Sequence, residues 1–151
     1  MAQITIIGSG LAGYTLAREI RKHDKESNLT IITSDDGRFY SKPLLSNALS
    51  KNMAADQLAT FSTEKMAAQV NANICVQTTV TAINPTKKTI NLAADEQAYD
   101  QLILAVGAHQ LIPPLVGDAV EKTISVNNLE QYATFRLALS KAKREAIIGA
   151  G

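Results

Sequence analysis

The chain has 151 residues, 46% of them hydrophobic, and a net charge of +1, which allow one buried core and give no electrostatic indication of a nucleic-acid partner. Its single cysteine, Cys75, excludes a disulfide framework and a zinc site built on paired cysteines, and we predict no metal site. No apolar run approaches the length that spans a bilayer and the N-terminus lacks a signal-peptide pattern, so we expect a cytoplasmic protein with no membrane partner.

The chain opens with a glycine-rich turn between a predicted strand and a predicted helix. The β-branched run at 3–7 predicts the strand, and the apolar spacing of 11–23 predicts the helix. Between them, Gly8, Gly10 and Gly13 form the G-x-G-x-x-G pattern of a dinucleotide-binding loop. We expect Gly8 to turn the chain, Gly10 to let a pyrophosphate approach, and Gly13 to let the helix lie close to the sheet. Backbone N–H groups at the helix start would then face the phosphates.

The predicted helix has two chemically different sides. Leu16, Ala17 and Ile20 fall on one side and predict its buried face. The opposite side carries four basic residues: Arg18, Arg21, Lys22 and Lys25. We favour a solvated helix face for them, and the alternative is a basic surface that steers an acidic protein partner.

A second buried strand is predicted at 29–33, and a polar turn follows it. In a dinucleotide site the end of this strand meets the adenosine ribose, whose hydroxyls usually donate to an acidic side chain. Thr33, Ser34 and Asp35 lie at that position. Either the hydroxyl side chains or the carboxylate could serve there, and a plain turn explains the same residues equally well.

The segment 40–46, with the sequence Tyr-Ser-Lys-Pro-Leu-Leu-Ser, predicts a short helix that begins near Pro43 and ends near Ser50. Lys42 is therefore placed at a helix start, where the helix dipole opposes a cation. Such a local conflict is typical of functional sites, although a solvated lysine is favoured from the sequence alone.

The middle of the chain predicts a helix at 63–70 and then a small antiparallel meander. The meander strands are predicted at 73–77, 79–83 and 89–92. A buried strand at 99–106 follows and ends on Gly107, which would let a backbone approach a neighbour closely.

A connector and another helix come next. Pro113 and Pro114 break regular structure, and Asn127 is placed to cap a helix from 128 to about 141.

The last residues, 146–151, repeat the sequence of 5–10 almost letter for letter and predict the opening of a second dinucleotide loop. A strand with no helix behind it cannot bury its own face, so we expect a fragment. The domains expected are a first nucleotide-binding domain at 1–110, and a connector with the truncated start of a second at 111–151.

Two such loops about 140 residues apart, with a meander inside the first unit, resemble the two-dinucleotide flavoprotein reductases. Within that family, the segments 6–22, 40–46 and 99–108 are similar to the rubredoxin–NAD(+) reductases, and a sister reductase that serves flavorubredoxin has a similar 40–46 element. The resemblance implies an α/β fold: a Rossmann-like three-layer FAD-binding domain with a parallel sheet, helices and an antiparallel meander. FAD would lie on the first nucleotide fold and NAD(P)H on the second.

The resemblance also implies which residues hold FAD. Those near the pyrophosphate belong to the glycine loop: Gly8, Ser9, Gly10, Leu11, Ala12 and Gly13. Thr33 and Ser34 would lie at the adenosine ribose, with Asp35 as a further candidate. Val80 would offer backbone hydrogen bonds to adenine.

Near the flavin, the resemblance implies a role for Lys42, followed by Pro43. The charge of Lys42 would favour the reduced, anionic flavin, which makes it the one catalytic candidate. Ala105, Val106 and Gly107 match a segment that closes over the cofactor, usually Ala-Thr-Gly, and Val106 replaces the threonine.

Ser41 and Ser46 stand at the C-x-x-x-x-C spacing of flavoprotein disulfide reductases, and serines cannot shuttle electrons as a dithiol does.

We therefore predict the FAD-binding portion of an NADH-dependent reductase that passes electrons through FAD to rubredoxin or a similar small iron protein, with the fragment inactive alone. The alternatives are a flavorubredoxin or ferredoxin reductase of the same family, and a dinucleotide-binding module without catalysis. A single-fold NAD dehydrogenase is disfavoured, because Tyr99 and Tyr132 lack a lysine four residues later.

Overall fold

The computed structural model describes residues 1–93 and 95–148, which fold as two compact units. The first unit combines Met1–Ser41 with Ala59–Ala108, and the second combines Lys42–Leu58 with the residues from His109 onward. The domain boundary predicted at residue 110 is not tested by this division, and it stays a prediction.

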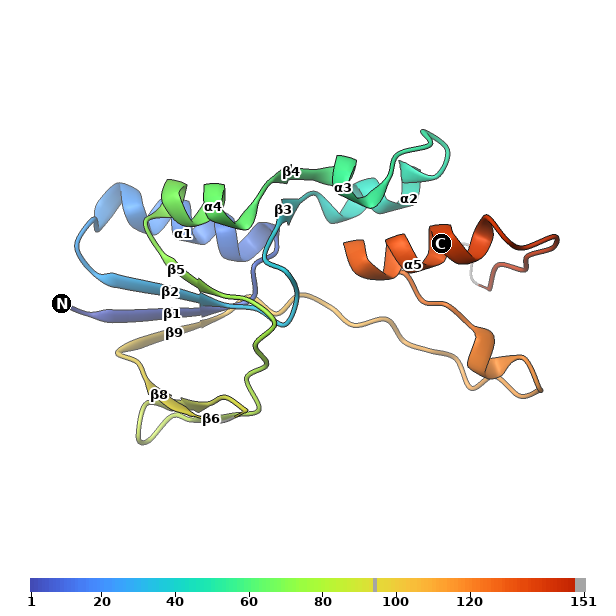
Figure 1. The fold of residues 1–151 in the computed structure, drawn as a ribbon. Helices are drawn as coiled ribbons and strands as arrows, with labels where there is room; N and C mark the ends of the chain where they lie inside the picture. Colours follow the sequence, from blue (N-terminus) through green and yellow to red (C-terminus); the bar gives the residue numbers. More distant parts are fainter. Residues whose placement is uncertain (94, 149–151) are drawn as a thin grey trace. The chain divides into compact units, whose positions relative to one another are not determined.

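The first unit is built on a four-stranded parallel sheet with the strand order β5-β2-β1-β9 (Figure 1). Its strands are β1 (Gln3–Ile7), β2 (Asn28–Ile32), β5 (Asn73–Cys75) and β9 (Gln101–Leu104). Ile7 pairs with Ile32 on one side and with Leu104 on the other, so the carboxyl ends of three strands meet at one edge. β1 has the predicted bounds, and β2 begins and ends one residue earlier than predicted.

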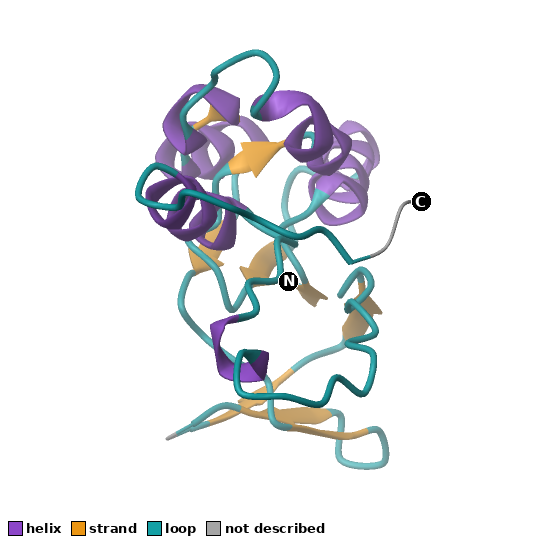
Figure 2. Cartoon of the chain, turned by 90° about the vertical axis from the view of Figure 1, so that its right-hand side faces the viewer, coloured by secondary structure: helices purple, strands orange, loops and turns teal. Residues whose placement is uncertain are grey.

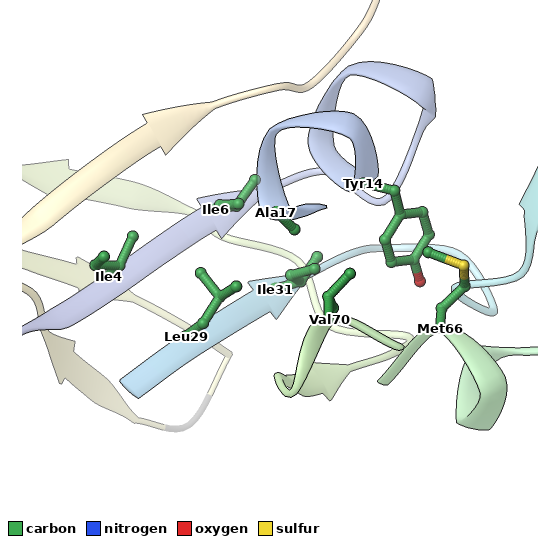
Figure 3. Packing of buried hydrophobic residues seen from close by; sticks show 8 residues of the cluster. All are labelled: Ile4, Ile6, Tyr14, Ala17, Leu29, Ile31, Met66 and Val70. Atoms are coloured by element: carbon green, nitrogen blue, oxygen red, sulfur yellow. The ribbon is translucent and has the colours of Figure 1, made fainter. Parts of the chain in front are cut away.

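Two helices cover one face of this sheet: α1 (Leu11–His23) and α4 (Thr63–Val70). Both have the predicted bounds. Alternate residues of β1 and β2 face them, because successive side chains of a strand point to opposite sides. Figure 3 shows the resulting core: Ile4, Ile6, Tyr14, Ala17, Leu29, Ile31, Met66 and Val70.

The other face of the sheet packs against an antiparallel meander of β6 (Ala82–Asn84), β7 (Thr89–Asn91) and β8 (Glu96–Ala98). Ile90 and Tyr99 lie there against Ile32, and Figures 1 and 2 both show the meander as a layer of its own. The predicted Rossmann-like three-layer α/β fold is confirmed.

The strands assigned to the meander were partly wrong. Residues 73–77 do not join it: β5 lies at the edge of the parallel sheet, where Ile74 pairs with Ile31. The third meander strand is instead β8, which the sequence did not predict because Glu-Gln-Ala has little β propensity.

A two-stranded antiparallel pair, β3 (Phe39–Tyr40) with β4 (Ala59–Phe61), lies beside α1 and α4. The Phe39 and Phe61 rings stack with centroids 6.1 Å apart, and the guanidinium of Arg18 lies 4.8 Å from the Phe39 centroid. Arg21 donates to the carbonyl of Val70, at 2.8 Å. The prediction of one solvated basic face is therefore wrong for these two arginines, whereas Lys22 and Lys25 are exposed as expected.

The second unit is helical. It contains the short 3-10 helix η1 (Lys42–Leu44), α2 (Leu45–Ala48), α3 (Ala55–Leu58), the 3-10 helix η2 (Val120–Lys122) and α5 (Leu129–Leu139). The helix predicted from Pro43 is thus divided into η1 and α2 and ends two residues early.

The cap of α5 lies one residue later than predicted. The side chain of Asn128, and not that of Asn127, accepts a hydrogen bond from the Gln131 N–H, at 2.8 Å. The Gln131 side chain in turn accepts from the Asn127 N–H, at 2.7 Å. Of the predicted second dinucleotide loop, 149–151 lie outside the described residues, and 146–148 are not in a strand.

Candidate dinucleotide-binding site

Two glycines of the loop at 8–13 are required by the fold itself. Gly8 has a φ of +112°, and a Cβ there would lie 2.2 Å from the carbonyl oxygen of Ala105. A Cβ on Gly13 would lie 2.0 Å from the carbonyl oxygen of Gly8. Because any larger residue would collide with backbone at these positions, Gly8 and Gly13 let β1, α1 and the end of β9 pack closely, as expected.

Gly10 differs from both, because a Cβ there would meet no atom within 4 Å in the described part of the chain. Its φ of −69° is open to any residue. The fold therefore leaves open space beside Gly10, at the N-terminus of α1.

The N-terminus of α1 has free hydrogen-bonding capacity. The first N–H groups of a helix have no intrahelical acceptor, and the helix dipole places partial positive charge there. Among the described residues no side chain caps α1, and its first turn has no acidic residue. Leu11 and Ala12 are exposed beside Gly10. This arrangement suits a phosphate group, which would accept from these amides.

The side chain of Ser9 makes a contact that the sequence did not predict. Ser9 is only 4% exposed, and its Oγ lies 2.9 Å from Thr33 Oγ1 and 3.0 Å from Asp35 Oδ1. Its hydroxyl therefore binds the end of β2, so the expected contact of Ser9 with a pyrophosphate would fall to its backbone. The glycine loop and the polar residues after β2 are therefore in direct contact.

Asp35 is the centre of this polar cluster. Its Oδ1 accepts from Thr33 Oγ1 at 2.7 Å and from the Gly37 N–H at 2.9 Å, besides the Ser9 hydroxyl. The bond to Gly37 makes the segment a turn, as one interpretation predicted. The contact of Asp35 with a ribose stays a prediction. Ser34 is exposed, and the structure records no hydrogen bond that joins it to the cluster within the described residues.

The segment that carries Asp35 is held through its carbonyl groups. The carbonyl of Thr33 accepts from the Thr78 N–H at 2.8 Å, and that of Asp35 accepts from the Gln77 N–H at 2.9 Å. Two side chains complete the set: Thr63 Oγ1 donates to the Asp36 carbonyl at 2.6 Å, and the Tyr14 hydroxyl donates to the Gly37 carbonyl.

Tyr14 and Thr63 were both missed as site residues. Tyr14 could have been found, because it lies one turn after Gly10 and one turn before Ala17 on the buried side of α1. Burial raises the pKa of Tyr14, and the negative charges of Asp35 and Asp36 raise it further. Thr63 has no such signal in the sequence.

The remaining predicted ligands are distributed over both units. The N–H of Ala105 continues the β9 ladder to the Ile7 carbonyl at 2.8 Å, while Val106 is 64% exposed and Gly107 has a φ of +71°. Val80 packs beside the meander core. Lys42 and Pro43 belong to the second unit, so the predicted approach of Lys42 to a flavin stays a prediction.

Neither a metal centre nor a membrane span is found in the structure described. No three His, Cys, Asp or Glu side chains among residues 1–93 and 95–148 gather in a way that could hold a metal ion. Over the same residues, no helix combines the length and the apolar character needed to cross a bilayer.

Comparison with known proteins assigns the family. A family model described as pyridine nucleotide-disulphide oxidoreductase matches residues 2–151. In structure, reduced CoADR-RHD of Bacillus anthracis is similar to this chain with a TM-score of 0.84, at 20% identity over 93% of this chain and 27% of that one. The chain belongs to the pyridine nucleotide-disulphide oxidoreductase family, and its first unit has the fold of the family's FAD-binding domain.

Within this family, the chain is similar to two kinds of reductase. The rubredoxin-NAD(+) reductase of Alcanivorax borkumensis is 44% identical over 151 residues, which are all of this chain and 40% of that protein. The nitric oxide reductase FlRd-NAD(+) reductase of Vibrio vulnificus is 34% identical over 98% of this chain and 39% of that protein. The chain thus spans about 40% of the length of these relatives.

Proposed function

We propose that this chain is the FAD-binding portion of a reductase that passes electrons from NAD(P)H, through FAD, to rubredoxin or a similar small iron protein. The observation that carries the proposal is the N-terminus of α1, where no described side chain caps the helix and no described atom fills the space beside Gly10. Backbone amides without intrahelical acceptors can donate to a diphosphate, and the absence of a Cβ at Gly10 lets it come close to the backbone. When bound, FAD supplies the redox chemistry, and the protein supplies binding and electrostatics.

The residues of the chain have separate tasks in this proposal. The amides at Gly10, Leu11 and Ala12 hold the diphosphate, and Asp35 holds the adenosine ribose. Val80 suits an adenine ring, because the structure records no hydrogen bond to its backbone N–H or C=O among the described residues. Lys42 adds positive charge near the flavin, as proposed from the resemblance.

Rubredoxin is the acceptor favoured by the relatives. The rubredoxin-NAD(+) reductase is 44% identical to this chain, against 34% for the FlRd-NAD(+) reductase, which makes flavorubredoxin the second candidate. Rates of reduction of both iron proteins by the full-length protein with NADH would separate the two. The cytoplasm is the compartment expected for such a reaction.

The test of the cofactor site is Gly10→Val in the full-length protein. We expect purified Gly10→Val to be colourless, because the valine side chain enters the space where the diphosphate approaches. Its free energy of unfolding should fall by no more than about 1 kcal/mol. The described part of the fold leaves that space open, and the remaining cost is that valine is a less favourable N-cap residue than glycine. The measurements are flavin absorbance and urea unfolding.

Ser62→Ala serves as the matched control. Ser62 caps α4 by accepting from the Lys65 N–H, so its loss also costs about 1 kcal/mol. This variant should remain yellow, since Ser62 is not part of the site. Stoichiometric FAD in Gly10→Val would overturn the proposed site. A yellow wild type that NADH does not bleach would indicate a binding module without catalysis.

A further inference from the structure

We propose that Ser9 and Thr33 are positioning residues, which fix the carboxylate of Asp35 so that it selects a nucleotide with an intact ribose. The inference rests on the proposed function, and it assigns a task to two hydroxyl groups that contact Asp35. Ser9 would act through Asp35 and not on the ligand itself.

The first argument is that one oxygen of the carboxylate is fully used within the protein. Oδ1 of Asp35 accepts hydrogen bonds from Ser9 Oγ, Thr33 Oγ1 and the Gly37 N–H, at 3.0, 2.7 and 2.9 Å. For Oδ2 the structure records no hydrogen bond among the described residues, and Asp35 is only half-buried. Oδ2 is thus the atom left to accept from a ligand.

The second argument is burial. Ser9 and Thr33 are 4% and 6% exposed, so neither hydroxyl can exchange its protein partner for bulk water. Buried hydroxyl groups keep hydrogen-bond partners, because losing one costs the desolvation of the group. Because the two hydroxyls are themselves fixed, they hold the carboxylate of Asp35 in one orientation.

The third argument is that the backbone cannot move the carboxylate away. The carbonyls on both sides of the turn, those of Thr33 and Asp35, accept from the amides of Thr78 and Gln77. A hydrogen-bond acceptor held in advance discriminates between ligands better than a mobile one, since binding does not have to order it. A ribose hydroxyl that donates to such a carboxylate makes a charge-assisted bond.

The test measures ligand selection by the full-length protein freed of FAD. ADP, 2′-deoxy-ADP and 3′-deoxy-ADP are titrated by calorimetry. In the wild type we expect ADP to bind on the order of tenfold more tightly than at least one deoxy analogue, as for loss of a bond to a charged group. In Ser9→Ala and Thr33→Val that ratio should fall to about twofold, through weaker binding of ADP with little change for the analogue.

Two further variants separate positioning from stability. Thr33→Ser keeps the hydroxyl and should keep the wild-type ratio. Ser62→Ala lowers stability far from the cluster and should keep it as well. A merely structural role for Ser9 would weaken ADP and its analogues equally and leave the ratio unchanged.

The outcomes distinguish this inference from the function on which it rests. An unchanged ratio in Ser9→Ala, or no discrimination by the wild type, would overturn the positioning role. A wild-type protein that binds neither FAD nor ADP would instead overturn the proposed function. Equal loss of discrimination in Asp35→Asn and in the double variant Ser9→Ala/Asp35→Asn would show that Ser9 acts through Asp35.

Discussion

Tyr14 is a buried residue of α1, and its hydroxyl binds the loop that contains Gly37. Its side chain has no exposed surface, its hydroxyl donates to the Gly37 carbonyl, and its ring meets Phe39 edge-on at 5.8 Å. Burial, followed by the charges of Asp35 and Asp36, raises the pKa of Tyr14 above its ordinary value. The native state therefore favours the neutral phenol.

We expect Tyr14→Phe to lower the free energy of unfolding by about 1 kcal/mol at pH 7, because the Gly37 carbonyl loses its donor. An unfolded tyrosine ionises near pH 10. Since the native pKa lies higher, the contribution of Tyr14 is complete below about pH 10 and is lost as the pH rises beyond it. The wild type should thus approach the variant in stability above pH 10. Urea unfolding at pH 7, 9, 10 and 11 measures this, and a constant difference would contradict it.

At the scale of elements, Arg21 on α1 contacts the carboxyl end of α4. The guanidinium of Arg21 donates to the carbonyls of Val70 and Asn71, at 2.8 and 2.7 Å. The last carbonyls of a helix lack intrahelical donors, and the helix dipole is negative there. Asn71 itself has a φ of +43° and ends the helix. Arg21 thus stabilises the end of α4.

Arg21→Lys should lower the free energy of unfolding by about 1–2 kcal/mol, because an ammonium group cannot donate to both carbonyls with the geometry of a guanidinium. Lys22→Met is the control, since Lys22 is exposed and pairs with Glu19 on the surface. We expect a change below about 0.5 kcal/mol for it. Urea unfolding measures both, and equal effects would contradict the role of Arg21.

How far the sequence could predict these elements depends on how local each signal is. The strand at 3–7 and the helix at 11–23 were predicted with their observed bounds, because hydrophobic period and glycine spacing lie within the segment itself. β5 was assigned to the wrong sheet. Its residues predict a strand, but its partner depends on the pairing of Ile74 with Ile31, which are far apart in the chain.

The candidate site shows the same division. The dinucleotide-loop pattern predicted that the residues after β2 would lie near the glycine loop, because the second strand of such a fold ends beside it. The contact between Ser9 and Asp35 depends on side-chain rotamers, and the role of Arg18 over Phe39 depends on packing between elements. No pattern of residue types contains such information.

At the scale of the whole molecule, the second unit is assembled from two segments far apart in the sequence. Tyr132 and Arg136 on α5 both donate to the Met53 carbonyl, at 2.8 and 2.6 Å. Arg136 also donates to the side chain of Asn52, at 2.9 Å, and Asn52 has a φ of +51°. The segment that follows Lys42 is therefore fixed by a helix more than 70 residues later.

Arg136→Ala should loosen that segment without opening the parallel sheet. We expect the amides of Asn52 and Met53, which donate to Leu49 and Ala48, to exchange with deuterium on the order of tenfold faster. Protection in β1 and β2 should be unchanged. Lys143→Ala removes a charge from an exposed position and serves as the control. Unchanged exchange at Met53 in Arg136→Ala would contradict this account.

No atom in the described part of the chain lies near the Cβ position of Gly10, and this also affects how the sequence can change in evolution. Folding selects glycine at positions 8 and 13, where a methyl group would strike backbone, but it does not select glycine at position 10. A molecule bound beside Gly10 would select against larger residues there. In a lineage of proteins that no longer bound the cofactor, position 10 would be the first of these three glycine positions to accept other amino acids, while positions 8 and 13 stayed glycine.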